Sequence, residues 1–233
     1  MRYELNRALV PESTRAIILD WDDTVVGTID AKMRQHRYVA EKHFGITLTI
    51  EQMKAEWGKP LHQLIESWYQ IPPGDEKRYE EVLATVLSYS SQFLKQPFAL
   101  TKEAIQAMRD QNYPLGIVTG SPRNDIYHDF EVIGMSDKYF NYFQASDDST
   151  YHKPDPRVFD PAKDWLESIG VASSQVLYMG DSLRDYAAAA GAGFMFLGVE
   201  TAVDDLPAFY QAGALSIRSL GDIIKAKGES WQN

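Results

Sequence analysis

Four short segments of this chain carry side chains that could transfer a phosphoryl group. They supply a carboxylate nucleophile, a second carboxylate for proton transfer, a hydroxyl, an ammonium, and further carboxylates suited to a hard cation. In chain order the segments are Asp20-Trp21-Asp22-Asp23-Thr24, Thr119, Lys153-Pro154, and Gly180-Asp181 with Asp185.

The first segment offers two carboxylates two residues apart. Asp20 could attack a phosphoryl group and form an aspartyl phosphate, which divides a difficult hydrolysis into two easier displacements. Asp22 could protonate the leaving oxygen and later deprotonate water. Taken alone, the same pattern fits a strand-end turn in which Asp22 or Thr24 caps a nearby backbone group.

Two further segments could bind the phosphoryl oxygens. We expect the hydroxyl of Thr119 and the backbone N–H groups of Gly120 and Ser121 to form a small anion cradle. Lys153 stands before Pro154, in a stretch that two prolines stiffen, and could neutralise charge on the nucleophile and the phosphoryl group. Taken alone, Thr119 could simply end a strand, and Lys153 could be a solvated surface lysine.

The last segment is rich in acids. Asp181 follows an apolar run, and Asp185 lies one helical turn further on, where it could bind a metal or orient Lys153. Magnesium is the expected cation, because it takes a few carboxylates together with substrate oxygens and water. Without a cation, the clustered acids would repel one another and a phosphate. The alternative is that Asp181 or Ser182 only caps a helix.

The elements that must position these residues can be predicted from hydrophobic patterning. Short continuous apolar runs indicate strands buried on both faces, hence a parallel sheet, and helical patterns alternate with them. Thr101 is the expected N-cap of the first of these helices. The predicted strands are 16–19, 115–118, 176–179 and 194–197, and the predicted helices are 102–110, 125–132, 157–168 and 186–190.

Residues 27–96 interrupt the alternation. Helical patterns at 31–44, 51–57, 61–69 and 75–94 are separated by glycine- and proline-containing breaks. We therefore predict an α/β protein with two domains: a doubly wound parallel sheet formed by residues 1–26 and 97–233, and an inserted helical domain formed by residues 27–96.

Composition limits the classes of function. A 233-residue chain with 44% hydrophobic residues can bury a substantial core, and its net charge of −10 disfavours nucleic acid and anionic membranes as partners. The lack of cysteine excludes disulfides and thiol chemistry. The N-terminus does not read as a signal peptide and no stretch reaches 18 apolar residues, so we expect a cytoplasmic protein.

Residues 16–24, 115–121, 153–154 and 180–185 resemble the four motifs of the haloacid dehalogenase-like hydrolase superfamily, in order. The helical insertion is similar to the cap of its phosphoglycolate phosphatase-like branch. The resemblance implies a Rossmann-like core that hydrolyses a small phosphate monoester through phospho-Asp20, with Asp22 as general acid/base, Thr119 as phosphate binder and Lys153 as the charge-stabilising lysine. It also implies magnesium held by the side chains of Asp20 and Asp181 and the backbone carbonyl of Asp22, with Asp185 as an accessory acid.

One residue departs from this family pattern. Asp23 stands where the family usually has glycine; if the site needs a positive φ, aspartate tolerates it better than most residues. Asp22 argues against the true dehalogenases and the phosphonate hydrolases, which lack an aspartate there. A phosphomutase that uses the same intermediate, and a non-catalytic binding protein on the same scaffold, remain alternatives.

Residues that select the substrate are harder to predict. The resemblance suggests that the loop Trp57-Gly58-Lys59-Pro60 reaches over the site, so that Trp57 could pack on a substrate and Lys59 could pair with a distal anion. Arg123, Arg34 and His36 are further candidates, although each also fits an ordinary surface or core role. The expected partner is a small phosphorylated metabolite, and the expected assembly is a monomer or dimer.

Overall fold

The computed structural model describes residues 3–57, 59–201 and 206–226, and the chain divides into two compact units. One unit comprises Met1–Gly27 and Gln96–Asn233, and the other comprises Thr28–Lys95. Each boundary lies one residue from the position predicted. None of the helices in the described part of the chain is long and apolar enough to span a membrane.

The first unit is built on a six-stranded sheet in which every neighbouring pair is parallel. The strand order is β4-β3-β2-β5-β6-β7, the doubly wound order of Rossmann-like folds. The fold class is therefore as predicted. The strands are β2 (Ala16–Leu19), β3 (Leu115–Val118), β4 (Tyr142–Gln144), β5 (Val176–Gly180), β6 (Met195–Val199) and β7 (Ser216–Ile217).

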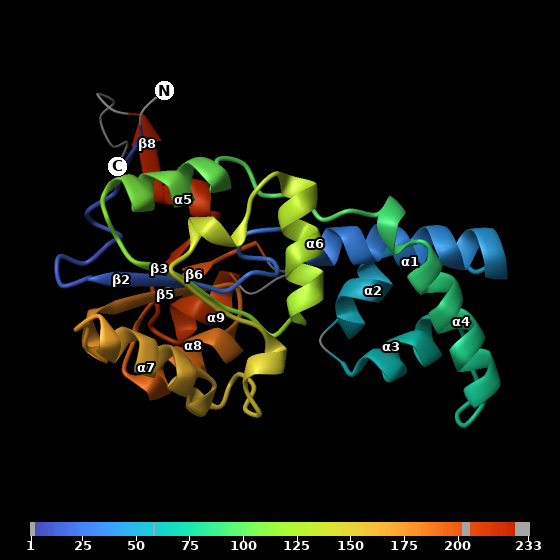
Figure 1. Ribbon diagram of the computed structural model, residues 1–233. Coiled ribbons are helices and arrows are strands. Elements are labelled where there is room, and N and C mark those ends of the chain that lie inside the picture. The colour runs from blue at the N-terminus through green and yellow to red at the C-terminus, as the bar shows by residue number, and fades with distance from the viewer. Residues whose placement is uncertain (1–2, 58, 202–205, 227–233) are drawn as a thin grey trace. The chain divides into compact units, whose positions relative to one another are not determined.

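A separate two-stranded antiparallel sheet pairs β1 (Tyr3–Leu5) with β8 (Ile224–Ala226). It brings the first and last described strands of the unit together beside α5 (Thr101–Asp110) (Figure 1). These two strands, together with β4 and β7, were not predicted, because each is only two or three residues long and none is a continuous apolar run.

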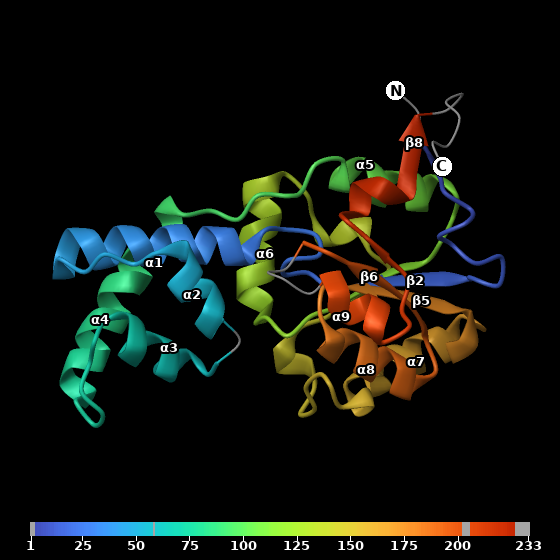
Figure 2. The ribbon, with the colours of Figure 1, turned by 180° about the vertical axis from the view of Figure 1, so that it is seen from behind.

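Helices cover both faces of the six-stranded sheet, as Figures 1 and 2 show from opposite sides. On one face, α5 and α6 (Arg123–Ile133) pack on residues such as Ile17 and Leu19. On the other face, α7 (Asp160–Ser168) and α8 (Leu183–Ala192) pack on Ile18 and Tyr178. A short helix, α9 (Leu206–Gln211), precedes β7. Every residue of β2, β3 and β5 is buried, as their unbroken apolar patterns predict.

Several helix boundaries differ from the predictions. Thr101 is the first residue of α5 rather than its cap; the N-cap is Leu100, in a left-handed conformation with φ 60°. The predicted helix 157–168 is a 3-10 turn, Pro156–Phe159, followed by α7. α8 begins at Leu183 rather than residue 186, because the Ser182 side chain accepts a hydrogen bond from the Asp185 N–H and so caps it.

The second unit is entirely helical across its described residues. It contains α1 (Thr28–Phe44), α2 (Ile50–Glu56), α3 (Leu61–Trp68), α4 (Glu76–Ser88) and a 3-10 turn (Ser90–Gln92). The predicted helix 75–94 therefore ends earlier, at Ser88. A capping box joins Thr49 and Gln52 at the start of α2, and Met53, Ile65 and Val82 are completely buried in the core of the unit.

Candidate active site

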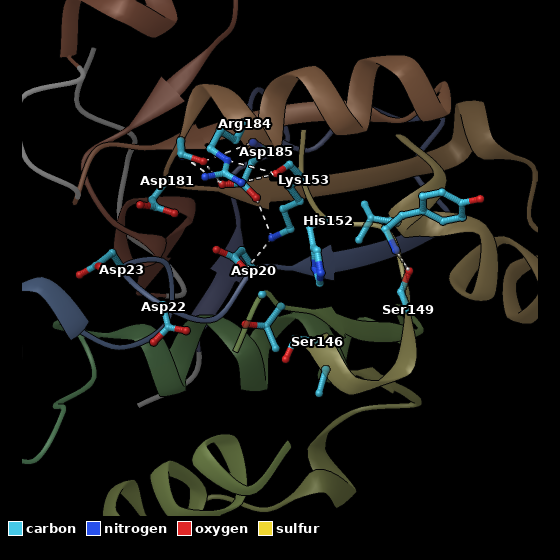
Figure 3. Close-up of a pocket in the computed structure, with 16 residues that line it drawn as sticks. Asp20, Asp22, Asp23, Ser146, Ser149, His152, Lys153, Asp181, Arg184 and Asp185 are labelled. Atoms are coloured by element: carbon cyan, nitrogen blue, oxygen red, sulfur yellow. Dashed lines mark hydrogen bonds and ion pairs between the residues drawn. The ribbon is translucent and has the colours of Figure 1, made fainter. Parts of the chain in front are cut away.

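Most of the site residues predicted for the first unit meet at the carboxyl end of the parallel sheet. Asp20 directly follows β2 and Asp181 directly follows β5, and these strands pair with Leu19 opposite Met179. The strand order reverses between β2 and β5, which is where doubly wound sheets bind their ligands. A pocket of about 500 Å³ opens there (Figure 3), and its lining includes Asp20, Asp22, Thr119, Gly120, Lys153 and Asp181.

A tight turn carries the first two carboxylates from the strand into the pocket. The Trp21 carbonyl accepts a hydrogen bond from the Val25 N–H at 2.8 Å, and the Asp23 N–H donates to the Val26 carbonyl at 2.7 Å. Asp23 has a φ of 52°. Its position therefore requires the left-handed conformation that glycine adopts freely and that aspartate tolerates. The substitution is compatible with the turn.

An ion triad forms the centre of the site. The Lys153 ammonium lies 2.7 Å from Oδ1 of Asp20 and 2.7 Å from Oδ1 of Asp185. Burial raises the pKa of Asp20 to about 7, although Lys153 opposes the shift. Burial also disfavours the charged form of Lys153, but Asp185 and Asp20 outweigh it and raise the lysine pKa. Lys153 therefore remains a cation, and any further cation at this site favours ionised Asp20.

Asp181 receives less compensation from Lys153, whose charge is the smallest of the effects on its pKa. Burial, followed by the charges of Asp20, Asp185 and Asp23, raises its pKa to about 9. Carboxylate oxygens of Asp20, Asp181 and Asp185 lie within 4.8 Å of one another. Hard oxygen donors with excess negative charge suit Mg²⁺ better than a soft metal. The residues present therefore fit a magnesium ion.

Metal-free protein is expected to lose stability as the pH rises from 7 to 9. In this range Asp181 is ionised in the unfolded chain but still largely protonated when folded, so raising the pH favours unfolding. The Asp20 pKa of about 7 adds a similar loss at lower pH. His36, whose pKa is lowered to about 4, has the opposite effect, but only below its ordinary value of 6.5.

Urea unfolding in EDTA at pH 7 and pH 9 measures this loss. We expect the free energy of unfolding of the wild-type protein to fall by about 1 kcal/mol per pH unit, below the single-proton limit of about 1.4. Asp181→Asn should flatten this slope, whereas replacement of the exposed Asp164 by asparagine should not. Equal slopes for wild type and Asp181→Asn would contradict the account.

Asp22 and Ser121 interact directly. The Ser121 hydroxyl donates to the Asp22 carboxylate, and the Ser121 N–H donates to Oγ1 of Thr119 at 3.1 Å. Asp22, Thr119 and Gly120 line the pocket, but Ser121 is not among its lining residues. The Ser121 N–H was predicted to bind phosphoryl oxygens, and this role stays a prediction; the Ser121 hydroxyl contacts Asp22.

Asp185 has several partners in addition to Lys153. The Tyr178 hydroxyl donates to Oδ1 of Asp185 at 3.0 Å, and the Ser182 N–H donates to Oδ2 at 3.2 Å. A Cβ at Gly180 would lie 2.6 Å from Cγ of Asp185, so glycine makes room for this carboxylate. These contacts support the interpretation in which Asp185 orients Lys153. Sequence reasoning missed Tyr178, which looked like one more apolar strand residue.

The remaining candidates have partners within their own units. Arg123 pairs with Asp148 and is not among the residues that line the pocket. Trp57 and Lys59 belong to the helical unit, where Trp57 stacks on Trp68 at 6.2 Å between ring centroids and Lys59 pairs with Glu56 at 3.1 Å. Their roles toward a substrate stay predictions.

Two other candidates on α1 have structural partners. Arg34 pairs with Asp30 at 2.8 Å. His36 is buried, its Nδ1 lies 3.1 Å from the Tyr69 hydroxyl, and burial followed by the charge of Lys32 lowers its pKa to about 4. His36 is therefore a core residue of the helical unit.

Sequence reasoning also missed part of the pocket wall. Arg184 donates to the Lys153 carbonyl, with Nε at 3.1 Å and Nη2 at 2.5 Å. Figure 3 shows His152 beside Lys153, with Ser146 and Ser149 on the same loop segment. Ser146, Ser149 and His152 follow no recognisable motif, and the path of the chain after β4 brings them to the pocket, whereas Arg184 reaches it from α8.

The doubly wound sheet and the acids at its switch point place the protein among α/β proteins that bind ligands at the carboxyl ends of parallel strands. Residues 17–199 match the family model described as haloacid dehalogenase-like hydrolase, and the chain belongs to this family.

Individual relatives support the same assignment. The chain is 24% identical over 229 residues to "Pyrophosphatase PpaX" from Oceanobacillus iheyensis, covering 94% of this chain and 99% of that protein. It is 32% identical over 102 residues to "Phosphoglycolate phosphatase" from Escherichia coli, covering 44% of this chain and 39% of that protein.

The fold also matches a solved structure. A crystal structure titled as a predicted phosphoglycolate phosphatase from Haemophilus somnus superimposes with a TM-score of 0.75 at 19% identity, covering 91% of this chain and 96% of that chain. At this level of identity the likeness concerns the fold alone.

Proposed function

We propose that this protein is a magnesium-dependent phosphatase that hydrolyses a small phosphate monoester through an aspartyl phosphate on Asp20. The observation that carries the proposal is the ion triad at the switch point, in which the Lys153 ammonium lies 2.7 Å from Asp20 while a third carboxylate, Asp181, lies in the same cluster of acids. A nucleophile, a fixed cation and a cation-binding acid therefore share one pocket with Asp22.

In the first step, an oxygen of Asp20 attacks the phosphorus of the substrate. A bond forms between this oxygen and phosphorus, and the bond between phosphorus and the leaving oxygen breaks. Asp22, in its protonated form, gives its proton to the leaving oxygen, so the alcohol departs neutral. The Lys153 ammonium, the Thr119 hydroxyl and the Gly120 N–H bind the phosphoryl oxygens and stabilise their charge.

In the second step, Asp22 acts as a general base, because it lost its proton in the first step. It takes a proton from a water molecule whose oxygen attacks the phosphorus, and the bond from phosphorus to Asp20 breaks. Inorganic phosphate and a free Asp20 carboxylate result, with Asp22 protonated again for the next cycle. The hydrogen bond from Ser121 holds the Asp22 carboxylate during these exchanges.

The proposed magnesium site comprises the side chains of Asp20 and Asp181 and the backbone carbonyl of Asp22, with Asp185 as an accessory acid that holds Lys153. A bound Mg²⁺ would neutralise charge shared between the acids and the phosphoryl group. The raised pKa values of Asp20, about 7, and Asp181, about 9, support a need for such a cation.

The substrate class is proposed on chemistry and relationship. The names of the relatives, a pyrophosphatase and a phosphoglycolate phosphatase, point to small phosphorylated molecules. The net charge of −10 argues against nucleic acid or an anionic membrane surface as a partner. A cysteine-free chain acting on a metabolite fits the cytoplasm. We expect the protein to work as a monomer or dimer.

A phosphatase screen with magnesium tests the proposal. The purified protein is incubated with p-nitrophenyl phosphate and a panel of phosphorylated metabolites, and released phosphate and organic products are quantified with Mg²⁺ or with EDTA. We expect phosphate release that requires Mg²⁺. An isomerised sugar phosphate without free phosphate would instead identify a phosphomutase, and no turnover of any compound would support a non-catalytic binding protein.

A further inference from the structure

The indole of Trp21 is hydrogen-bonded to a buried carboxylate that the proposed reaction does not use. Nε1 of Trp21 donates to Oδ2 of Asp129 at 2.9 Å. Trp21 is 0% exposed and Asp129 is 4% exposed. The two residues are 108 positions apart in the sequence, and Trp21 stands between the proposed nucleophile Asp20 and the proposed acid/base Asp22.

Hydrophobic packing alone does not explain why a carboxylate stands beside Trp21. Trp21 lies edge-on to Phe130 and Phe140, with ring centroids 5.0 Å and 6.4 Å away, in the apolar cluster on one face of the sheet. A carboxylate buried beside such a cluster is costly unless it is hydrogen-bonded, and an apolar side chain in its place would avoid that cost. What the hydrogen bond adds is direction, because it fixes the rotation of the indole ring.

The backbone of Trp21 holds the turn that carries the catalytic acids. Its carbonyl accepts hydrogen bonds from the N–H groups of Thr24, Val25 and Val26, at 3.3, 2.8 and 3.3 Å. Trp21 therefore anchors this turn through its backbone carbonyl, while its side chain is held by Asp129. A displacement of the Trp21 backbone would move Asp20 on one side and Asp22 on the other, and the hydrogen bond that anchors the indole opposes such a displacement.

Asp129 also belongs to an element tied to the phosphate-binding segment. It lies on α6, which begins at Arg123, directly after Thr119-Gly120-Ser121-Pro122. The hydrogen bond thus joins the nucleophile turn to the helix that continues from the proposed anion cradle. Both segments must contact the same phosphoryl group, and this hydrogen bond restrains the position of one relative to the other.

We propose that the Trp21–Asp129 hydrogen bond is a positioning contact that fixes Asp20 and Asp22 in reactive geometry. The inference rests on the proposed function. In-line attack by Asp20 and proton transfer by Asp22 must occur on one phosphoryl group, and a misplacement of about 1 Å can cost about 10²-fold in rate. Asp129 touches neither the substrate nor the reacting atoms; it acts through Trp21.

Three substitutions test the proposal on p-nitrophenyl phosphate with saturating Mg²⁺. Trp21→Phe keeps an aromatic ring but removes the donor; Asp129→Leu removes the acceptor; Asp129→Asn keeps an acceptor oxygen. We expect kcat to fall by about 10- to 100-fold in the first two variants with KM changed by less than about threefold, and Asp129→Asn to remain within about threefold of wild type in both. The double variant Trp21→Phe/Asp129→Leu should lose less than the two single losses multiplied together, because both substitutions remove the same contact.

Met108→Ala is the stability control. Met108 is completely buried in the same apolar cluster, so its truncation weakens the fold at a position outside the turn. Measured well below the unfolding temperature of every variant, it should keep the wild-type kcat. Circular dichroism confirms that each compared variant is folded, and if Trp21→Phe does not fold, the comparison of Asp129→Asn with Asp129→Leu decides.

The possible results separate the two hypotheses. If the wild-type protein is active, two results would overturn the positioning role but leave the proposed phosphatase function standing. These are an unchanged kcat in Trp21→Phe and an equal loss of kcat in Asp129→Asn and Asp129→Leu. A loss of kcat in Met108→Ala as large as that in Trp21→Phe would also overturn it, since general loosening would then explain the effect. Absence of turnover by the wild-type protein would overturn the proposed function and this inference with it.

Discussion

Replacing Asp20 by asparagine is expected to abolish phosphatase turnover while the protein remains folded. The amide cannot form the acyl phosphate, and loss of a covalent nucleophile costs about 10⁴-fold or more in kcat. The fold should tolerate the change, because the asparagine oxygen can still accept from Lys153 and because Asp20 already carries a raised pKa caused first by burial. Steady-state kinetics with Mg²⁺, together with thermal unfolding, measures both effects.

Asp164→Asn provides the matched control for this substitution. It makes the same chemical change at an exposed position on α7, and we expect wild-type kcat and KM. Substantial residual turnover in Asp20→Asn, after hydrolysis of the new amide back to aspartate has been excluded by mass spectrometry, would show that another group attacks the phosphoryl group.

Replacing Lys153 by methionine should reduce both activity and stability. The side chains of Lys153, Asp20 and Asp185 are 11%, 10% and 2% exposed, so this ion triad is shielded from water. Removing one partner of a buried ion pair leaves the others uncompensated and typically costs about 3–5 kcal/mol of folding free energy. Loss of the ammonium should also lower kcat by at least about 10²-fold, because charge on the phosphoryl oxygens loses its fixed partner.

Urea unfolding and kinetics of Lys153→Met and Lys153→Arg separate these two effects. Arginine keeps the positive charge but replaces a compact ammonium with a planar guanidinium, so it should recover part of the stability and little of the activity. A Lys153→Met protein as stable as wild type would contradict the importance of the triad. Unchanged kcat would contradict a role for Lys153 in the reaction.

Much of the site could be predicted because strand ends converge. Asp20, Thr119 and Asp181 each follow a continuous apolar run, and in a parallel sheet such ends meet at one edge. The conformation of Asp23 could also be anticipated from its neighbours in the sequence, because aspartate tolerates a positive φ and Asp23 has a φ of 52°. These features depend on residues close together in the sequence.

What could not be predicted depends on contacts between distant segments. Ser121 turns its hydroxyl toward Asp22, 99 residues earlier, and the Trp21 indole finds Asp129 in the middle of α6. No local pattern marks either pair. The prediction that Thr101 is the N-cap of α5 was also wrong. Thr101 is completely buried as the first residue of the helix, and Leu100 takes the N-cap position in a left-handed conformation.

The short strands expose a second limit. β4 and β7 contain three and two residues, and polar residues in both break the apolar pattern by which β2 and β5 were found. They join the sheet through pairing with β3 and β6 rather than through their own sequence. Tertiary context therefore determines the edges of this sheet, whereas hydrophobic patterning determines its centre.

The most direct measurement is the detection of phosphate on Asp20. The protein is mixed with a phosphate monoester and Mg²⁺, quenched in the millisecond range, reduced with borohydride to convert an acyl phosphate to homoserine, and mapped by mass spectrometry. The account predicts homoserine at position 20, and none in Asp20→Asn or in the absence of substrate. Reduction at another carboxylate, or rapid turnover with position 20 always recovered as aspartate, would contradict it.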